Sequence, residues 1–259
     1  RKIPESPEWK LNRYTSLNFS LDSERLFFGR VPQVSQQLSL AKITEEKDLF
    51  DANIVTGQRG LKVWHGDDPR IKPNEIKQYE DEQKRTYLAV LHLGSNNVVQ
   101  LGDKTVPDVT ISQHKRFMLA SSDLPYRKMA TWAGFYQDYY LVDINTGSKV
   151  PFLTQQPSDA EPTLSGNGKY VAYYQQGNVY LYDIAQDRRT NLTKSLKVSF
   201  ADEDHDYPSS APGYGFGPWL KNDAGFLVYD KYDVWQFNTE SKAGFALTAG
   251  QGRAQKIQY

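Results

Sequence analysis

The densest group of ionisable side chains lies in the segment 201–208, which reads Ala-Asp-Glu-Asp-His-Asp-Tyr-Pro. The group consists of Asp202, Glu203, Asp204, His205 and Asp206. Four carboxylates within five residues can hold a cation or the amino group of a substrate. We therefore expect Glu203, Asp204, His205 and Asp206 to contact substrate. The alternative is a solvated loop whose charge keeps sheet edges apart.

A second candidate is Trp64 with His65, which Gly-Asp-Asp follows at 66–68. A Trp exposed beside acidic residues can serve as a recognition platform, because aromatic side chains anchor interfaces. The alternative is a Trp packed in the core, with Asp68-Pro69 beginning a turn. Both interpretations stay open, and we add Trp64 and His65 to the predicted substrate contacts.

Catalytic and metal-binding patterns are missing from the sequence. There is no cysteine, and the four histidines form no His-x-x-x-His or Glu-x-x-His pair. A nucleophile elbow needs Gly-x-Ser-x-Gly on a strand-turn-helix. The nearest string, 164–168, begins with Leu and reads as a hairpin. We predict no catalytic residue, no metal site and no cofactor, and keep as a weaker option a glycosidase using Asp204 and Asp206.

Composition narrows the class of partner and fold. Lys plus Arg and Asp plus Glu both number 31, so no net charge favours nucleic acid as a partner. No apolar run approaches the ~20 residues that span a bilayer. Aromatic residues make up 13% and favour sheet, since they suit a pleated, half-buried surface. The chain begins Arg-Lys-Ile-Pro without a signal-peptide pattern, so we expect an excerpt of a longer polypeptide.

The elements that must position these residues recur along the chain. A strand, a polar turn and an apolar strand occur at 17–28, 109–119, 162–173 and 218–229. Each unit ends on a further strand whose leucines, Leu101, Leu153, Leu192 and Leu247, are separated by 52, 39 and 55 residues. Four-stranded propeller blades repeat at roughly 40–50 residues. A β-sandwich is the alternative, because its strands also recur at short intervals.

The repeat predicts an all-β fold, a β-propeller with about four four-stranded blades in one segment, 1–259. The approximate blades are 14–102, 106–155, 160–194 and 215–250, with an inserted loop at 31–60. A helix is predicted from Pro73 to Arg85, because Pro is favoured in the first helical turn. About four blades are visible, and we expect an open arc rather than a closed ring, whose terminal blades expose strand edges that need a partner or cover.

Ordered landmark strings resemble a known family. Residues 62–69, Lys-Val-Trp-His-Gly-Asp-Asp-Pro, are followed by Ile71-Lys-Pro73. The strings 25–29 upstream and 229–235 downstream, with Gly252-Arg253 and Lys256-Ile257, occur in the order seen in the propeller of large bacterial peptidases. The chain thus resembles the propeller region of the prolyl oligopeptidase family of serine peptidases, with a TolB-like or dipeptidyl peptidase N-terminal-like β-propeller.

The resemblance implies a non-catalytic propeller segment that gates or orients peptide substrates. The partner it implies is an α/β-hydrolase catalytic domain of the same parent chain, bearing a Ser-Asp-His triad that no residue of this chain matches. Similar proteins are exported, which implies a periplasmic or extracellular location. The alternative function is a TolB-like propeller that binds a protein or glycan without any catalytic role. The peptide, the total number of blades and the oligomeric state are not fixed by the sequence.

Overall fold

The computed structural model describes residues 3–259 except 5, 34–43, 53, 55–63 and 113. The loop predicted over 31–60 falls mostly outside the described residues, and its described part contains a 3-10 helix, η1 (Glu46–Phe50). Val31 and Pro32, which the sequence assigned to that loop, instead end a strand because they pair with Lys10 and Trp9.

Four antiparallel sheets make up the described part of the chain. Blade one contains β1 (Trp9–Lys10), β2 (Leu17–Phe19), β3 (Arg25–Pro32), β4 (Tyr87–His92) and β5 (Asn97–Gln100). Blade two contains β6 (Asp108–Thr110), β7 (Phe117–Ser122), β8 (Tyr136–Asp143) and β9 (Lys149–Pro157). Blade three contains β10 (Thr163–Leu164), β11 (Tyr170–Gln175), β12 (Asn178–Asp183) and β13 (Arg188–Asn191). Blade four contains β14 (Phe216–Trp219), β15 (Gly225–Tyr229), β16 (Val234–Asn238) and β17 (Gly244–Ala246).

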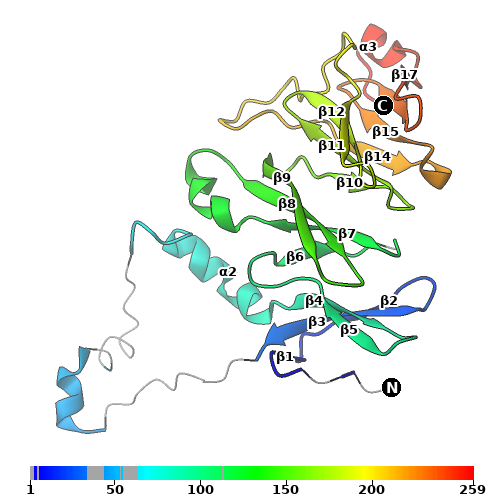
Figure 1. The fold of residues 1–259 in the computed structure, drawn as a ribbon. Coiled ribbons are helices and arrows are strands. Elements are labelled where there is room, and N and C mark those ends of the chain that lie inside the picture. Colours follow the sequence, from blue (N-terminus) through cyan, green and yellow to red (C-terminus); the bar gives the residue numbers. More distant parts are fainter. Residues whose placement is uncertain (1–2, 5, 34–43, 53, 55–63, 113) are drawn as a thin grey trace.

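Each blade is a meander in which strands adjacent in the sequence pair with each other. Blade one departs from four strands, because β1 and β2 pair with different parts of the same edge of β3. The four sheets follow one another in chain order as a stack, from β1–β5 to β14–β17 (Figure 1). The predicted all-β class, with about four propeller blades in an arc, is confirmed.

Alternation along the strands explains the stacking. In β7, Met118 and Ala120 belong to the core shared with blade one, while Leu119 between them belongs to the core shared with blade three. In β11, Val171 packs toward blade two and Ala172 toward blade four. Successive side chains on a strand point to opposite faces, so each inner blade buries apolar groups on both of its faces. Apolar burial on this pattern is the main force that stacks the blades.

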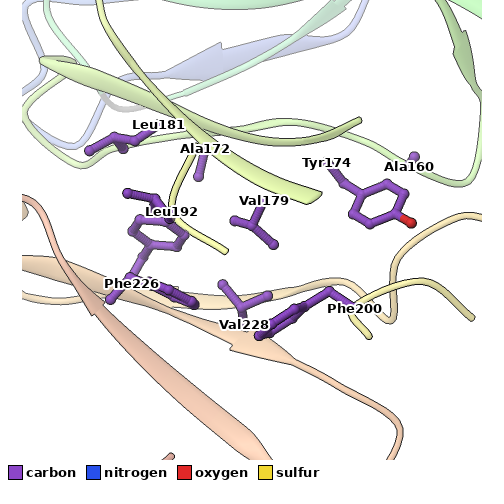
Figure 2. Close-up of a cluster of buried hydrophobic side chains, with 10 residues drawn as sticks. Ala160, Ala172, Tyr174, Val179, Leu181, Leu192, Phe200, Phe226 and Val228 are labelled. Carbon is purple, nitrogen blue, oxygen red and sulfur yellow. The ribbon is translucent and has the colours of Figure 1, made fainter. Parts of the chain in front are cut away.

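The core between blades three and four is rich in aromatic side chains. Val179 and Leu192 of blade three meet Phe226 and Val228 of blade four, and Phe200 from the connection between the blades closes the cluster (Figure 2). Phe226 and Phe200 are almost fully buried. Aromatic side chains thus fill the space between these two sheets.

Connections alternate between two ends of the stack, because antiparallel strands reverse direction at every step. One end, the turn end, carries the short connections from the first to the second and from the third to the fourth strand of each blade. The other, the loop-bearing end, carries the remaining connections, including the long ones. These are 33–86 with α2 (Lys72–Lys84), 123–135 with η2 (Leu124–Thr131), and 192–215. In Figure 1, α2, η2 and the loop beyond β13 project on the same side.

The predicted helix over 73–85 is confirmed as α2, with Pro73 in its first turn. None of its residues is buried. An ion-pair chain instead ties it to blade two: Arg85 bonds Glu82 at 3.1 Å and Asp108 at 2.9 Å, and Arg70 bonds Glu82 at 3.2 Å. Burial alone would raise the pKa of Glu82, but the two guanidinium groups outweigh it and lower that pKa.

Candidate functional site

A pocket of about 550 Å³ opens at the loop-bearing end between the segment 64–72 and the connection 123–135. Three aromatic side chains on its wall are largely exposed: Trp64 at 64%, Trp132 at 63% and Phe135 at 69%. We call it the aromatic pocket. Large aromatic groups exposed together mark binding surfaces more often than single exposed apolar residues do.

The first wall is held by a tight turn at 65–68. The backbone N–H of His65 donates to the Asp68 carboxylate at 3.1 Å, and this bond, with the Lys72 ammonium at 3.5 Å, lowers the pKa of Asp68. The N–H of Asp67 donates to Nδ1 of His65 at 3.0 Å. The turn thus ends at Asp68, where the sequence predicted that a turn would begin. It leaves Trp64 at the surface rather than in the core.

The second wall is η2 with the residues that follow it. Tyr126 donates its hydroxyl proton to Asp138 at 2.6 Å, and Arg127 pairs with Asp123 at 2.9 Å. Burial, followed by the Asp138 hydrogen bond, raises the pKa of Tyr126 to about 12, so it stays a neutral donor. An ion pair of 2.9 Å between Lys128 and Asp67 joins this wall to the first.

Charges in the aromatic pocket are compensated within the described residues. Each charged side chain that lines it has an ion-pair partner; these are Asp68, Arg70, Lys72, Asp108, Asp123, Arg127 and Lys128. The surface left for a ligand is therefore aromatic and hydrogen-bonding rather than charged. Such a lining fits a neutral or apolar stretch of a ligand and offers no concentrated charge for an anion.

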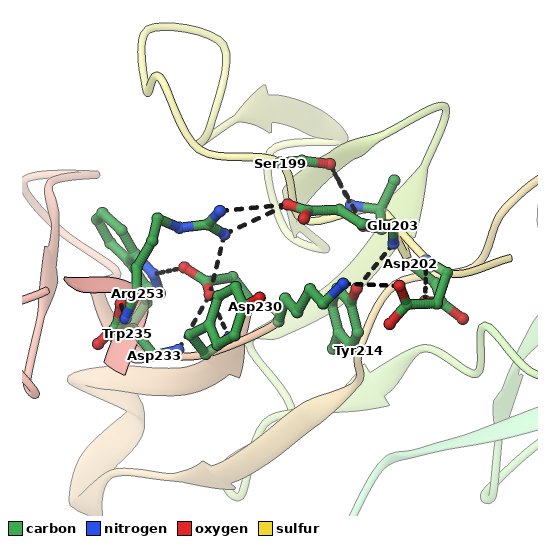
Figure 3. A network of polar contacts seen from close by, with 12 residues as sticks. Ser199, Asp202, Glu203, Tyr214, Asp230, Asp233, Trp235 and Arg253 are labelled. Carbon is green, nitrogen blue, oxygen red and sulfur yellow. Dashed lines mark hydrogen bonds and ion pairs between the residues drawn. The ribbon is translucent and has the colours of Figure 1, made fainter. Parts of the chain in front are cut away.

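The acidic segment also lies at the loop-bearing end, where its side chains contact blade four and the helix that follows it (Figure 3). Glu203 pairs with Arg253 at 3.4 Å, and Asp204 pairs with Lys231 at 2.6 Å. His205 hydrogen bonds through Nε2 to Ser209, 3.0 Å from its carbonyl oxygen. Asp206 is exposed. Two of the four predicted contacts thus fasten the connection 192–215 to blade four.

Lys231 lies in the turn between β15 and β16, which contains Asp230 and Asp233, whereas Arg253 lies in α3 (Gln251–Gln255) after the last strand. Asp230, with a fully buried carboxylate, accepts from Trp235 Nε1 at 2.7 Å and from the N–H of Tyr232 at 2.7 Å (Figure 3). Asp233 accepts from Thr248 at 2.6 Å and from the N–H of Gly252 at 2.9 Å. Burial would raise the pKa of Asp233, but these hydrogen bonds prevail and lower it. Both aspartates thus accept backbone N–H groups in this region.

The structure separates the predicted contacts into two groups. Trp64 and His65 line the aromatic pocket, whereas none of the residues 203–206 lines it. The groups still approach each other, because Ser209, the partner of His205, lies against Gly134 beside Phe135. The sequence did not predict that Trp132, Phe135 and Tyr126 would line this pocket. The signal for them was a connection between two strands of blade two that is too long for a hairpin and rich in aromatic residues.

Metal and membrane signatures are absent from the part of the chain that the structure describes. Within it, no three His, Cys, Asp or Glu side chains are arranged to hold a metal ion. None of the helices in that part combines the length and apolar character of a membrane span.

Comparison with known proteins identifies a propeller region. Residues 112–203, less than half of the chain, match the family described as the dipeptidyl peptidase IV (DPP IV) N-terminal region. The match runs from the end of the first strand of blade two to the acidic segment. This part of the chain is therefore similar to a propeller region of the dipeptidyl peptidase IV N-terminal type, which confirms the resemblance seen in the sequence. A search of curated proteins gives no match.

Solved structures that align with most of this chain include TolB proteins and a prolyl endopeptidase. TolB from Acinetobacter baumannii has 10% identity and a TM-score of 0.38, with 90% of this chain and 56% of that chain covered. A structure from a study of two prolyl endopeptidases has 9% identity and a TM-score of 0.42, with 94% and 29% covered. A putative TolB from Agrobacterium tumefaciens has 12% identity and a TM-score of 0.40, with 95% and 64% covered. The chain thus spans less than two thirds of each of these proteins, and such distant likenesses assign no activity to it.

Proposed function

We propose that this chain is a non-catalytic propeller segment of a larger serine peptidase-like hydrolase, and that its loop-bearing end binds and orients peptide substrates. The parent would carry the α/β-hydrolase catalytic domain and would work in the periplasm or outside the cell. The chain itself would bind peptide and leave the chemistry to that domain.

The exposed aromatic wall of the pocket is the single observation that carries this proposal. Trp64, Trp132 and Phe135 are each more than 60% exposed in one pocket, although the surrounding charges are all paired. Peptides present apolar side chains and backbone amides, which suit aromatic faces and unbonded polar groups. The family match over 112–203 supports a peptidase parent. The matched residues include the η2 wall of the aromatic pocket.

Tryptophan fluorescence offers a direct test. Trp64 and Trp132 are the most exposed of the chain's five tryptophans, because Trp9, Trp219 and Trp235 are partly buried. Titration with N-acetylated apolar peptides should shift the emission to shorter wavelength as these two rings leave water. Trp132→Ala should weaken binding about tenfold or more, the range of an interface anchor.

The matched control is Trp219→Phe, on the first strand of blade four and outside the lining of the aromatic pocket. It should leave peptide affinity unchanged. Peptide affinity that is the same in the wild type and in both Trp64→Ala and Trp132→Ala would end the proposal. Binding of a folded protein or a glycan in place of peptides would favour the TolB-like alternative, and the chain should hydrolyse none of these ligands.

A further inference from the structure

A second pocket, of about 440 Å³, lies between blades three and four, and Ser158 lines it as well as the aromatic pocket. Its walls come from the connection 158–163, from β11 and β12, and from the segment 213–216. Its charged lining residues are Asp159 and Glu161, and no Lys, Arg or His lines it. We call it the carboxylate pocket.

Both carboxylates are exposed, and neither forms an ion pair with any described residue. This sets them apart from the predicted acids Glu203 and Asp204, which Arg253 and Lys231 neutralise. The negative field of Asp159 and Glu161 contributes to the raised pKa of Tyr139, although burial is its main cause. The carboxylate pocket is thus a concave, uncompensated negative site next to a neutral aromatic one.

A buried hydroxyl points to a ligand independently of the charges. Tyr174, only 4% exposed, lines the pocket, and its hydroxyl has no hydrogen-bond partner among the described residues. Burial raises the pKa of Tyr174 to about 12. The nearby Gly177 N–H partly opposes that rise, although it forms no complete hydrogen bond with the Tyr174 hydroxyl. A buried polar group left unsatisfied costs free energy, which a donor from a bound ligand can recover. Figure 2 shows Tyr174 beside Ala160, which also lines this pocket.

We propose that the carboxylate pocket binds the basic side chain of a peptide, a lysine or an arginine. Asp159 and Glu161 supply the opposite charge, Tyr174 supplies its unbonded hydroxyl, and Tyr214 and Tyr229 supply ring faces. Ammonium and guanidinium groups are attracted both to carboxylates and to aromatic faces. A divalent metal fits less well, because no third carboxylate or imidazole among the described residues completes a ligand set.

Because Ser158 lines both pockets, they adjoin, and one extended ligand can reach both. The inference rests on the proposed function, in that the basic residue belongs to a peptide whose apolar part occupies the aromatic pocket. It adds the substrate class: peptides that carry a basic residue near an apolar one.

The first experiment measures calorimetric binding of N-acetylated, C-amidated peptides that differ in one residue, lysine or the uncharged norleucine. Because the ends are blocked, the side chain is the variable charge. Wild type should bind the lysine peptide about tenfold more tightly, the effect of one charge-assisted contact. Glu161→Gln and Asp159→Asn should each reduce this ratio, and the double variant should bring it close to one. The ratio should also fall at high salt.

Matched controls separate charge from structure. Glu240→Gln removes the same charge at the turn end, where Glu240 is exposed, and should leave the ratio unchanged. Tyr174→Phe removes only the unsatisfied hydroxyl, so it should leave Tm unchanged or raise it while lowering the lysine preference. A role of Tyr174 in packing alone would move neither the preference nor the affinity.

The outcomes distinguish this inference from the proposed function. Equal affinities for the two peptides, or a lysine preference that survives the double variant, would overturn the carboxylate pocket while Trp132→Ala still tests the aromatic one. If no peptide binds, the proposed function fails. The pocket is then judged by NMR titration with N-acetyl-lysine methylamide against its norleucine analogue, where shifts confined to the lysine compound and lost in the double variant support it, and their absence refutes it.

Discussion

The two ends of this blade stack are built from the same strands but are held in opposite ways. At the turn end, contacts pass from blade to blade: Arg25 donates to the His114 carbonyl at 2.7 Å, and the His114 ring lies against Gly168. Asp223 then accepts from Ser165 and from the N–H of Asn167, each at 2.9 Å. The corresponding links at the loop-bearing end join exposed side chains, such as Lys128 and Asp67.

The difference teaches where stability and binding reside. Buried hydrogen bonds at the turn end contribute more than exposed ion pairs, which contribute about 0–1 kcal/mol each. A stack fixed at one end can leave its other end open, with aromatic groups that no other blade covers. Loops on a rigid scaffold are where binding residues gather.

The largest effect expected from a single substitution is at Gly168. Its φ is +66°, and an added Cβ would lie 2.2 Å from the His114 ring. Gly168→Ala should therefore lower the free energy of unfolding by about 4 kcal/mol, from strained backbone together with a forced shift of the ring. Urea unfolding measures it.

The loop-bearing end provides the control, Gly66→Ala. No atom lies within 4 Å of a Cβ added there. This change should stay within about 0.5 kcal/mol of wild type. Similar losses in the two variants would erase the contrast between the ends.

A smaller loss is expected at Asp223, which is 2% exposed. Asp223→Ala leaves the Ser165 hydroxyl and the Asn167 N–H without their acceptor, at a cost of about 2 kcal/mol. Asp206→Ala, at an exposed position of the acidic segment, should cost less than about 0.5 kcal/mol. Thermal unfolding of the pair checks this, and an Asp206→Ala loss as large as that of Asp223→Ala would contradict it.

A still smaller effect should appear as pH falls. Burial lowers the pKa of His114 below its ordinary value near 6.5, so the folded chain binds a proton there less readily than the unfolded chain. The stability contributed by neutral His114 is fully present above pH 6.5 and is lost as pH falls toward the folded pKa. His114→Gln should reduce the fall in Tm between pH 7.5 and 5.5. An identical fall in both proteins would show that His114 does not link the turns in its neutral form.

The sequence predicted most of the fold and less of the site. The third blade was readable because Gly177 and Gly168 mark its turns and the apolar strands between them are short. The sequence did not predict that two strands pair with one edge of β3. The strand β1 is only two residues long, and its partners in β3 lie more than twenty residues away in the chain. Acidic spacing identified Glu203 and Asp204 without revealing that Arg253, fifty residues away in the chain, pairs with Glu203.

The isolated acids Asp159 and Glu161 escaped notice for the same reason. Their spacing resembles any polar connection between blades, and only the fold shows that no cation lines their pocket. Pairing is a property of three-dimensional neighbours, so a charge cluster in sequence and an uncompensated charge in space are different things.

Photo-cross-linking tests the central claim most directly, that the loop-bearing end holds peptide. An N-acetylated peptide containing benzoylphenylalanine would be irradiated with the chain, and the attachment points found by mass spectrometry. The account predicts attachment within 64–72 and 124–136, competed by excess unlabelled peptide. Attachment to the turn end, at 20–25, 114–116 or 165–169, would contradict it.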